Sequence, residues 1–392
     1  MDGRQWLDLH GNFTTLIHGH AFPPIVEAVE RQLRDGTCFA NPTLAEIALA
    51  ELLCERVCGL DRLRFVNTGT EAVMFAVKAA RAFTGRPAIA KIEGAYHGSY
   101  DWVEISQTSD ATNWGSAEEP NSIPYYAGTP ASVANDVVTL RLNDAQSAAR
   151  LIEKHAGRLA AVLLDPMPSR AGLIPVEPAF VEAVVTAARR HGVLVISDEV
   201  MNFRLGYTGA AARAGLAPDL WTFGKIIGGG FPIGAIGGRA AVMSVFGGEG
   251  VAAAVSQGGT FSANPVSMVA GLASMQALTV DAFEKLEAHG DTLRTRFESG
   301  VAQHKLPLSI TGSASLLRVH GRAKPPRDYR DTVAGDRSIV ARMVEHFSRE
   351  GLLVPSSGMI CLSTALSATD IERVATVFEA FASAEALRGE KA

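Results

Sequence analysis

The chain has little cysteine and no long hydrophobic run, and each shortage argues against a class of protein. Its 392 residues include only four cysteines: Cys38, Cys54, Cys58 and Cys361. Cys54 and Cys58 have the i, i+4 spacing of a helix face, but no further His or Cys pair joins them as zinc ligands would require. We therefore expect reduced thiols in the core or on a helix face, and no metal in the functional site.

Neither sign of charge dominates the chain. The 36 Lys and Arg residues against 41 Asp and Glu residues leave a net charge of −5, which gives no reason to expect a nucleic acid or an anionic membrane as partner. Apolar runs such as LAAVLLD and GVLVISDEV are too short to span a membrane. No charged segment followed by an apolar core opens the sequence, which favours a cytoplasmic location.

Short apolar runs alternate with amphipathic helical patterns from about residue 43 to 280. Strands are expected at Arg64–Asn67, Ala88–Glu93, Val137–Leu142, Leu159–Asp165, Val193–Asp198, Trp221–Phe223 and Ile233–Gly237. Helical patterns such as Glu71–Phe83, Asp144–His155 and Pro178–His191 separate most of them. Continuous apolar strands between helices predict an α/β fold whose mostly parallel, seven-stranded sheet is covered on both faces. Ligands of such sheets bind at the carboxyl ends of the strands.

The last hundred or so residues have a different pattern. Long helices are expected at Val280–His304, Ser338–Glu350 and Thr369–Ala384, with short strands near Ser315–Val319 and Met359–Ser363. This pattern predicts a small α+β domain made of residues 1–42 and 281–392 beside a large domain of residues 43–280. Within the large domain, Gln107–Asn135 is rich in Gly, Pro, Ser, Asn and Thr and is expected to form a long surface loop, which is usually functional or disordered.

Two glycine-containing segments are candidates for binding a phosphate group. The first, NTGTEA, lies between a strand and a helix, so Gly69 would allow close backbone approach, the helix N-terminus would offer free N–H groups, and Thr70 would add a hydroxyl. The alternative is ordinary helix capping by Thr70 with Glu71 nearby. The second segment, GGTFSANP, places Thr260 before a helix that starts at Asn264, and a simple turn and cap is its alternative.

An acid and an aromatic residue follow two of the expected strands. Asp198 ends the apolar run VLVISD, where a buried carboxylate is costly without a cationic partner. The protonated pyridine nitrogen of pyridoxal 5′-phosphate (PLP) is such a partner, and the protonated ring withdraws electrons from a substrate carbanion. Tyr96, in the segment YHG, could stack on a planar heterocycle. A cap or salt bridge for Asp198, and a plain loop residue for Tyr96, are the alternatives.

Lys225 is the residue on which the functional interpretation depends. It lies among glycines and apolar residues in FGKIIGGGFPIG, so burial should lower its pKa and favour the neutral amine that forms a Schiff base. Lys78, in EAVMFAVKAARAF, lies instead on the polar side of a helix and is expected to be solvated. The run Gly228–Gly230 lacks the G-x-G-x-x-G spacing of a dinucleotide site.

Taken together, these segments resemble the class III (subgroup II) aminotransferases of PLP fold type I, and most of all the glutamate-1-semialdehyde 2,1-aminomutase group. The similarity extends over almost the whole chain, through LDLHGNFTTLIHGHAFPPIVEAV, FANPT, NTGTEAVMFAVKAARAFTGR, EGAYHGSYD, ISDEVMNFR, FGKIIGGGFPIGAIGG and GGTFSANPVSMVAG to the tail GLLVPSSGMICLSTALSATDIERV.

The resemblance implies a role for each matching residue. Lys225 would form the Schiff base with PLP and move protons, and Asp198 would pair with the ring nitrogen. Tyr96 would stack on the ring, with Val200 against its other face. The phosphate would be held by Gly69 and Thr70, and by Thr260 from the neighbouring subunit of a homodimer.

Three departures from the family pattern concern the substrate. In the family, a segment that carries a carboxylate-binding arginine precedes the position of Asp2, and that role is here unfilled or met elsewhere. Asp165-Pro166 replaces the usual Glu-Pro. Arg170 stands where the aminomutase has asparagine, and it could bind a carboxylate with its forked guanidinium or form a surface salt bridge. Arg204, which follows the family pattern, could contact substrate or be structural.

We therefore expect an enzyme that moves an amino group between an amino acid or amine and a keto acid or aldehyde by a ping-pong mechanism. An intramolecular aminomutase of the glutamate-1-semialdehyde type is the alternative, although the missing carboxylate-binding segment argues against it. A non-catalytic binding protein that keeps the PLP fold is a third hypothesis. The presence of Lys225, Asp198 and Tyr96 together argues against it.

Overall fold

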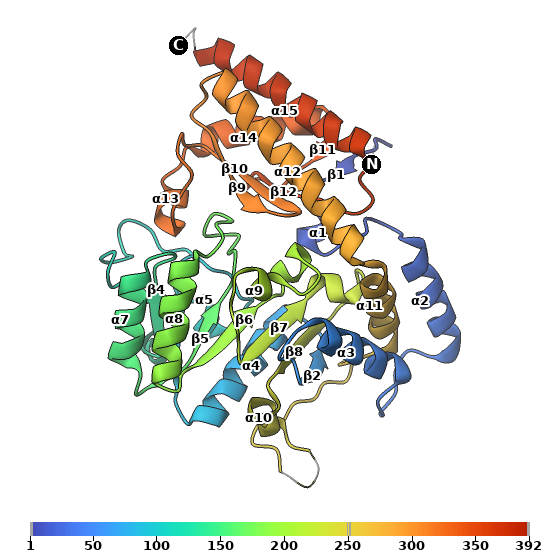
Figure 1. Cartoon of the computed structure of the whole chain (residues 1–392), viewed down its shortest axis with the longest axis vertical. Helices are drawn as coiled ribbons and strands as arrows, with labels where there is room; N and C mark the ends of the chain where they lie inside the picture. Colours follow the sequence, from blue (N-terminus) through green and yellow to red (C-terminus); the bar gives the residue numbers. More distant parts are fainter. Residues whose placement is uncertain (1–2, 249, 251, 390–392) are drawn as a thin grey trace.

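The computed structural model describes residues 3–248, 250 and 252–389, with a large part built on a seven-stranded sheet and a smaller part beside it (Figure 1). The strand order is β2-β8-β7-β6-β5-β3-β4, and β8 alone is antiparallel to its neighbours β2 and β7. The strands are β2 (Arg62–Val66), β3 (Ala88–Ile92), β4 (Val137–Leu140), β5 (Leu159–Leu164), β6 (Leu194–Asp198), β7 (Leu220–Gly224) and β8 (Gly234–Gly238). The predicted α/β fold with a mostly parallel sheet is confirmed.

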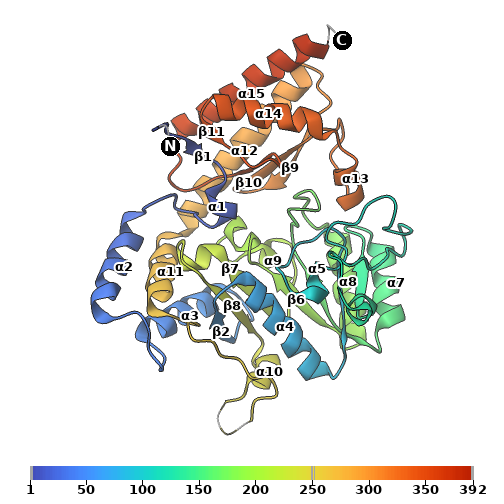
Figure 2. The same cartoon turned by 180° about the vertical axis from the view of Figure 1, so that it is seen from behind.

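Helices cover both faces of this sheet. Helix α4 (Gly69–Thr84) lies on one face, and α7 (Ala145–His155) and α8 (Pro178–Arg190) lie on the other (Figures 1 and 2). Ile89 of β3 packs in the same apolar cluster as α4, whereas the next residue, Ala90, packs in the cluster of α7 and α8. Successive side chains of a strand point to opposite faces, so apolar residues predominate at successive positions of the buried strands.

The smaller part is a three-stranded antiparallel sheet, in the order β12-β10-β9, covered by long helices. Its elements are β9 (Ser309–Ser313), β10 (Leu316–His320), β12 (Met359–Cys361), α12 (Val280–Gln303), α14 (Arg337–Arg349) and α15 (Ala368–Gly389). Phe297 of α12 and Phe378 of α15 stack with their ring centres 3.8 Å apart in the core between the helices. The predicted helices and both predicted strands are present, and β9 is an additional strand.

The N-terminal segment contacts both parts of the molecule. Strand β1 (Leu7–Asp8) pairs in parallel with β11 (Leu352–Leu353) of the smaller part, whereas α2 (Pro23–Asp35) packs on α11 (Pro265–Ala277) of the large part. The remaining elements are α1 (Gly11–Thr14), α3 (Leu44–Arg56), α5 (Asp101–Glu104), α6 (Ala131–Asn135), α9 (Ala210–Arg213), α10 (Ala240–Met243), α13 (Tyr329–Val333), η1 (Asn202–Leu205), η2 (Lys225–Gly228) and η3 (Ser244–Phe246).

The division into domains of residues 43–280 and of residues 1–42 with 281–392 stays a prediction, and residues 1, 2 and 390–392 of it lie outside the described residues.

Among the described helices, none by itself combines the length and hydropathy of a membrane span. Helices α11 and α12 meet those criteria only jointly, across a bend of 72°.

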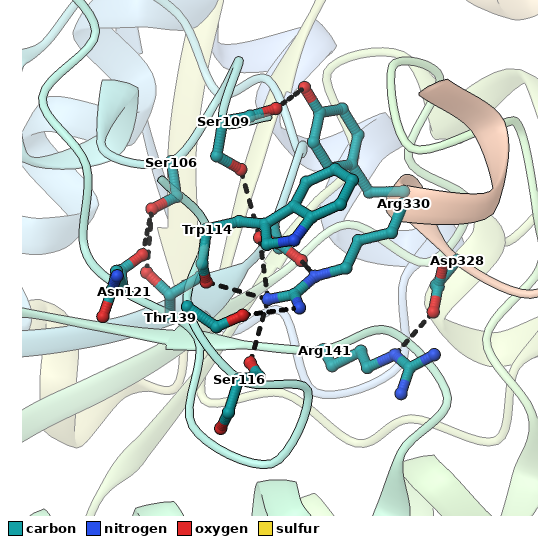
Figure 3. A network of polar contacts seen from close by, with 12 residues as sticks. Ser106, Ser109, Trp114, Ser116, Asn121, Thr139, Arg141, Asp328 and Arg330 are labelled. Atoms are coloured by element: carbon teal, nitrogen blue, oxygen red, sulfur yellow. Dashed lines mark hydrogen bonds and ion pairs between the residues drawn. The ribbon is translucent and has the colours of Figure 1, made fainter. Parts of the chain in front are cut away.

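The predicted surface loop Gln107–Asn135 is anchored by the smaller part (Figure 3). Arg330 of α13 bonds through Nε to the buried carboxylate of Glu93 at 2.8 Å. The same guanidinium donates to the loop carbonyls of Trp114, Gly115 and Ser116 at 2.9 to 3.0 Å. The end of the loop, Ala131–Asn135, forms α6. Because one side chain satisfies three loop carbonyls, the loop is held in one conformation at the edge of the sheet.

Replacing Arg330 by methionine should therefore destabilise the protein and release the loop. The change leaves the carboxylate of Glu93 buried without its ion-pair partner, which costs about 3 to 5 kcal/mol. Chemical denaturation measures the loss, and amide hydrogen exchange should become faster between Gln107 and Asn121. Arg327→Ala is the control, since Arg327 is 78% exposed in its pair with Asp331 and its loss should change stability little. Equal effects of the two changes would contradict the anchoring role.

Candidate active site

Asp198 lies at the end of β6 and is almost fully buried, with 4% of its surface exposed. Its Oδ2 accepts from Nδ1 of His97 at 2.6 Å, and its Oδ1 accepts from the amide of Val200 at 3.0 Å and the hydroxyl of Thr222 at 3.1 Å. Burial acts to raise the pKa of Asp198, but the hydrogen bond from His97 and the other donors together lower it below its usual value. Asp198 is thus a buried carboxylate that stays ionised.

His97 is a functional residue that the sequence reasoning missed. Its side chain is buried, and burial lowers its pKa, so a neutral ring donates from Nδ1 to Asp198. The other ring nitrogen, Nε2, is buried with no hydrogen-bond partner among the described residues. The sequence offers one signal for this residue: a histidine lies next to Tyr96 after one strand, and an acid ends another strand. Parallel strands bring their carboxyl ends together, so these two side chains can meet.

Two further carboxyl groups lie close to Asp198, and their pKa values move the other way. Burial, followed by the charge of Asp198, raises the pKa of Asp165 well above its usual value. Burial also raises the pKa of Glu199 to about 7, although the amides of Ala210 and Ala211 donate to it. Like charges in one dry site cannot all ionise. Of the three carboxyl groups, Asp198 is therefore the one whose pKa lies below its usual value.

Lys225 follows β7 as the first residue of η2, in a left-handed backbone conformation with φ of 49°. Burial lowers the pKa of Lys225, and the charges of Asp198 and Asp165 act in the opposite direction. In the described part of the chain the amine forms no hydrogen bond or ion pair. This is the buried, uncommitted amine that the sequence predicts, and the charge of Asp198 is near enough to act on it.

Gly69, Gly224 and the side chain of Val200 form a tight cradle beside Lys225. A Cβ atom at Gly69 would lie 2.7 Å from Cγ1 of Val200, and one at Gly224 would lie 3.2 Å from the same atom. A Cβ atom at Gly69 would clash with Val200, and one at Gly224 would require a small shift of the same side chain. The backbones of β7 and α4 are therefore brought together around one side chain, and the role of Val200 against a cofactor ring stays a prediction.

Helix α4 starts at Gly69, and its N-terminal groups are available to a ligand. Thr68 caps the helix by accepting from the amide of Glu71 at 3.1 Å, so the alternative that made Thr70 the cap is wrong. The hydroxyl of Thr70 instead accepts from the amide of Ser99 at 3.2 Å. Within the residues that the structure describes, the amides of Gly69 and Thr70 have no acceptor. Free N–H groups at the start of a 16-residue helix suit a phosphate.

The remaining candidates form no hydrogen bond to Asp198 or Lys225 in the described part of the chain. Tyr96 is 41% exposed, and Cζ of Arg170 lies 4.9 Å from the centre of its ring. Thr260 lies in an exposed loop that lines a cavity of about 1040 Å³ together with residues 38–43 and 62–65. No hydrogen bond joins Thr260 to the group around Asp198 in the described chain. The helix after it is capped by Asn264, as the turn-and-cap alternative expected.

The position of Arg204 favours its structural interpretation. The side chain is fully buried and donates to the hydroxyl of Ser315 at 3.0 Å, to the carbonyl of Thr14 at 2.9 Å and to the carbonyl of Leu362. These acceptors belong to the N-terminal segment and the smaller part. Arg204 therefore ties three distant segments together beneath the site, and its donors are already committed to protein groups.

The cysteines and acidic residues offer no metal site in the described chain. No group of three or more His, Cys, Asp or Glu side chains is disposed to hold a metal ion in residues 3–248, 250 and 252–389. Cys38 and Cys58 are exposed and Cys361 is buried, all as free thiols. The polar groups that converge at the strand ends are those around Asp198 and Lys225.

This arrangement, with an ionised acid, a buried free amine and an open helix N-terminus at adjacent strand ends, is that of a PLP enzyme. A sequence model of the class III aminotransferases matches residues 1–384, and the chain belongs to that family. The glutamate-1-semialdehyde 2,1-aminomutase 2 of Geobacillus kaustophilus is 36% identical over 375 residues, which cover 95% of this chain and 85% of that protein. The aminomutase of Methanothermobacter thermautotrophicus is 36% identical over 364 residues, 92% of this chain and 83% of that protein.

Solved structures of transaminases are also similar to the chain. An omega-transaminase from Sphaerobacter thermophilus superimposes with a TM-score of 0.94 at 47% identity, covering 97% of this chain and 87% of that one. A beta-phenylalanine aminotransferase from Variovorax paradoxus superimposes with a TM-score of 0.86 at 34% identity, covering 96% and 82%. The predictions of the family, of PLP fold type I and of a PLP-dependent enzyme are confirmed.

The residues present fit PLP. The two unbonded amides at the start of α4 can donate hydrogen bonds to a phosphate, and the ionised carboxylate of Asp198 can hold a proton on a ring nitrogen. Val200 packs directly against Gly69 and Gly224, so its side chain could support one face of a flat ring. The amine of Lys225 could serve as the nucleophile that the aldehyde of the cofactor requires.

Proposed function

We propose that this chain is a ping-pong transaminase that moves an amino group from an amino acid or amine to a keto acid or aldehyde, with Lys225 as its proton-transferring residue. The observation that carries the proposal is the buried amine of Lys225, which has a lowered pKa and no partner in the described residues. A lowered pKa favours the neutral amine, which can take a proton from carbon and return it, as general base and then general acid.

The other residues of the site would prepare this proton transfer. PLP, when bound, supplies an electron-withdrawing ring that stabilises negative charge on the carbon that carries the amino group. Asp198 would keep a proton on the ring nitrogen, and His97 would hold Asp198 ionised and oriented through its bond of 2.6 Å. Gly69 and Thr70 would orient the cofactor through its phosphate. Tyr96 would cover one face of the ring, and Val200 would cover the other.

Similarity favours a transaminase over an aminomutase. The omega-transaminase of Sphaerobacter thermophilus is 47% identical to this chain, whereas the aminomutases of the two thermophiles above are 36% identical. The aminomutase remains the second candidate because those relatives cover more than nine-tenths of the chain.

Single-substrate reactions separate the three hypotheses. Purified protein loaded with PLP and mixed with one amino donor, without an acceptor, should release one keto product per subunit and convert the cofactor to its amine form. An aminomutase would instead return an isomer of glutamate 1-semialdehyde, and a binding protein would change neither compound. Borohydride reduction followed by peptide mass analysis should find the cofactor on the peptide that contains Lys225. Label on another peptide would reject the proposal.

We further propose a homodimer in which Thr260 completes the phosphate site of the neighbouring subunit. Phe39, which lines the cavity beside Thr260, is 55% exposed, and Phe261, which follows Thr260 in the chain, is 59% exposed. Apolar surface of this kind favours coverage by another protein surface. A second copy of the chain would bury it and bring Thr260 to the other site.

The dimer proposal predicts a mass and a cofactor effect. Light scattering should give twice the chain mass of 41.4 kDa. Thr260→Ala should weaken PLP binding about tenfold, the loss of one hydrogen bond to a charged group, as measured by fluorescence titration. Thr292→Ala is the control, because the hydroxyl of Thr292 bonds only within its own helix, to the carbonyl of Ala288. A monomer that binds PLP tightly would reject the shared site.

A further inference from the structure

Arg170 is a cation without an acidic partner beside the candidate active site. It lies in the loop after β5, is exposed, and stands 4.9 Å over the ring of Tyr96. Glu104 is near enough for Arg170 to lower its pKa, although burial raises that pKa more, and the two groups form no ion pair. The only described contact of the guanidinium is therefore with an aromatic face, and its hydrogen-bond donors remain available.

The smaller part of the molecule holds the loop of Arg170 by its backbone. Arg318 of β10 donates from Nη1 to the carbonyl of Ser169 at 2.8 Å, and the hydroxyl of Thr332 donates to the carbonyl of Ala171 at 3.0 Å. A Cβ atom at Gly172 would lie 2.3 Å from the same Thr332 hydroxyl oxygen, so the loop packs directly against α13. The carbonyls on both sides of Arg170 are thus tied down.

A third attachment follows at Gly172. Its carbonyl accepts from the hydroxyl of Thr311 at 2.7 Å and lies 3.1 Å from Nε2 of His320. Burial, followed by the charge of Arg318, lowers the pKa of His320 to about 3, so its ring is neutral and Nε2 carries the proton that this carbonyl accepts. Side chains of the smaller sheet and α13 thus hold the carbonyls of Ser169, Ala171 and Gly172 and fix the backbone that carries Arg170, as a binding residue requires.

Arg318 adds a second positive charge behind the loop. Burial, followed by the charge of Arg337, lowers its pKa to about 10, so it remains charged at neutral pH. Its acceptors are the carbonyls of Ser169 and Ser357, and it has no carboxylate partner in the described chain. Arg170 and Arg318 are thus two cations close together that form no ion pair in the described chain, and such a pair of charges attracts anions.

We infer that Arg170 binds the carboxylate of the substrate, so the preferred amino donors are amino acids rather than simple amines. A guanidinium presents two parallel N–H donors to a carboxylate, and the fixed loop keeps this fork beside Tyr96. The inference rests on the proposed transaminase function. It assigns carboxylate recognition to Arg170, whose role the sequence left open between substrate binding and a surface salt bridge.

The test compares amino acids with amines in which a methyl group replaces the carboxylate. The pairs are alanine with isopropylamine, 3-aminobutanoate with sec-butylamine, and 4-aminobutanoate with butylamine, which also separate α, β and γ donors. The kcat/KM ratio within the best pair should favour the amino acid, and Arg170→Gln should lower that ratio about 10- to 100-fold, the effect of losing a charged hydrogen-bond donor. Arg170→Lys should restore part of it. Arg189→Gln, an equal charge change on an exposed arginine of α8, should not alter the ratio.

Competitive inhibition gives a second measurement that does not depend on turnover of the competing compound. Butanoate and butanamide have the same shape, and Arg170→Gln should raise the inhibition constant of butanoate about tenfold or more while changing that of butanamide little. If no donor converts the cofactor, the transaminase function itself is rejected. If donors are converted but the ratio and the butanoate constant are unchanged in Arg170→Gln, the function stands, and Arg170 only packs on Tyr96.

Discussion

Replacing Lys225 by alanine is expected to leave a folded protein whose turnover falls by at least about 10⁴-fold. The amine is the group that attaches the cofactor and moves the proton, and the loss of a covalent catalytic group costs more than the loss of any binding contact. Folding should survive because the amine has no hydrogen-bond partner in the described residues, so its removal leaves no polar group unpaired. The single-substrate reaction measures the first effect, and circular dichroism measures the second.

Lys91 provides a matched control, because it is the other buried lysine with a lowered pKa. Burial lowers its pKa to about 7, but its amine donates to the carbonyls of Ile92 and Ile105 at 3.0 and 2.8 Å. Lys91→Met leaves two buried carbonyls short of a donor and should cost about 2 to 4 kcal/mol of stability. The remaining folded protein should still be yellow when loaded with PLP. Turnover of Lys225→Ala within tenfold of the wild type would contradict the assignment of Lys225.

Asp198→Asn is expected to lower turnover by at least about 10²-fold, because an amide cannot hold the ring nitrogen of the cofactor in its protonated form. The residue keeps its shape, so the bonds from Thr222 and the amide of Val200 to Oδ1 can persist. The N–H group of His97 would then face either the oxygen or the NH₂ group of the asparagine side chain. The absorbance maximum of the bound cofactor should also shift, which reports on the ring without depending on turnover.

Asp165→Asn is the control for this change. Asp165 follows the neighbouring strand β5, and burial with the charge of Asp198 raises its pKa, so losing its ability to ionise should matter less than at Asp198. Its oxygen accepts from the amide of Met167 at 2.8 Å, which an asparagine oxygen can also do. We expect turnover within about fivefold of the wild type. If Asp165→Asn were the more damaging of the two, the negative charge of the site would be misassigned.

The elements of the large sheet could be predicted from local pattern because each strand is buried on both faces. Seven apolar runs were predicted and seven strands are present, with ends that agree to within two residues, as at Val137–Leu140. The additional strand β9, with the sequence SITGS, carries no apolar run. It is a strand because it pairs along its length with β10, and local sequence does not encode that partner.

Residue chemistry and order along the chain determined the candidate site: a lysine among glycines, an acid that ends an apolar strand, and glycine and threonine at a helix start. These features depend on neighbours in sequence, and local pattern therefore contains them. The tertiary structure alone decided that His97 keeps Asp198 ionised, that Arg204 is committed to protein carbonyls, and that Arg170 is fixed beside Tyr96 by residues more than 130 positions away. Burial and charge are properties of groups that meet in space, and only the packed chain brings those groups together.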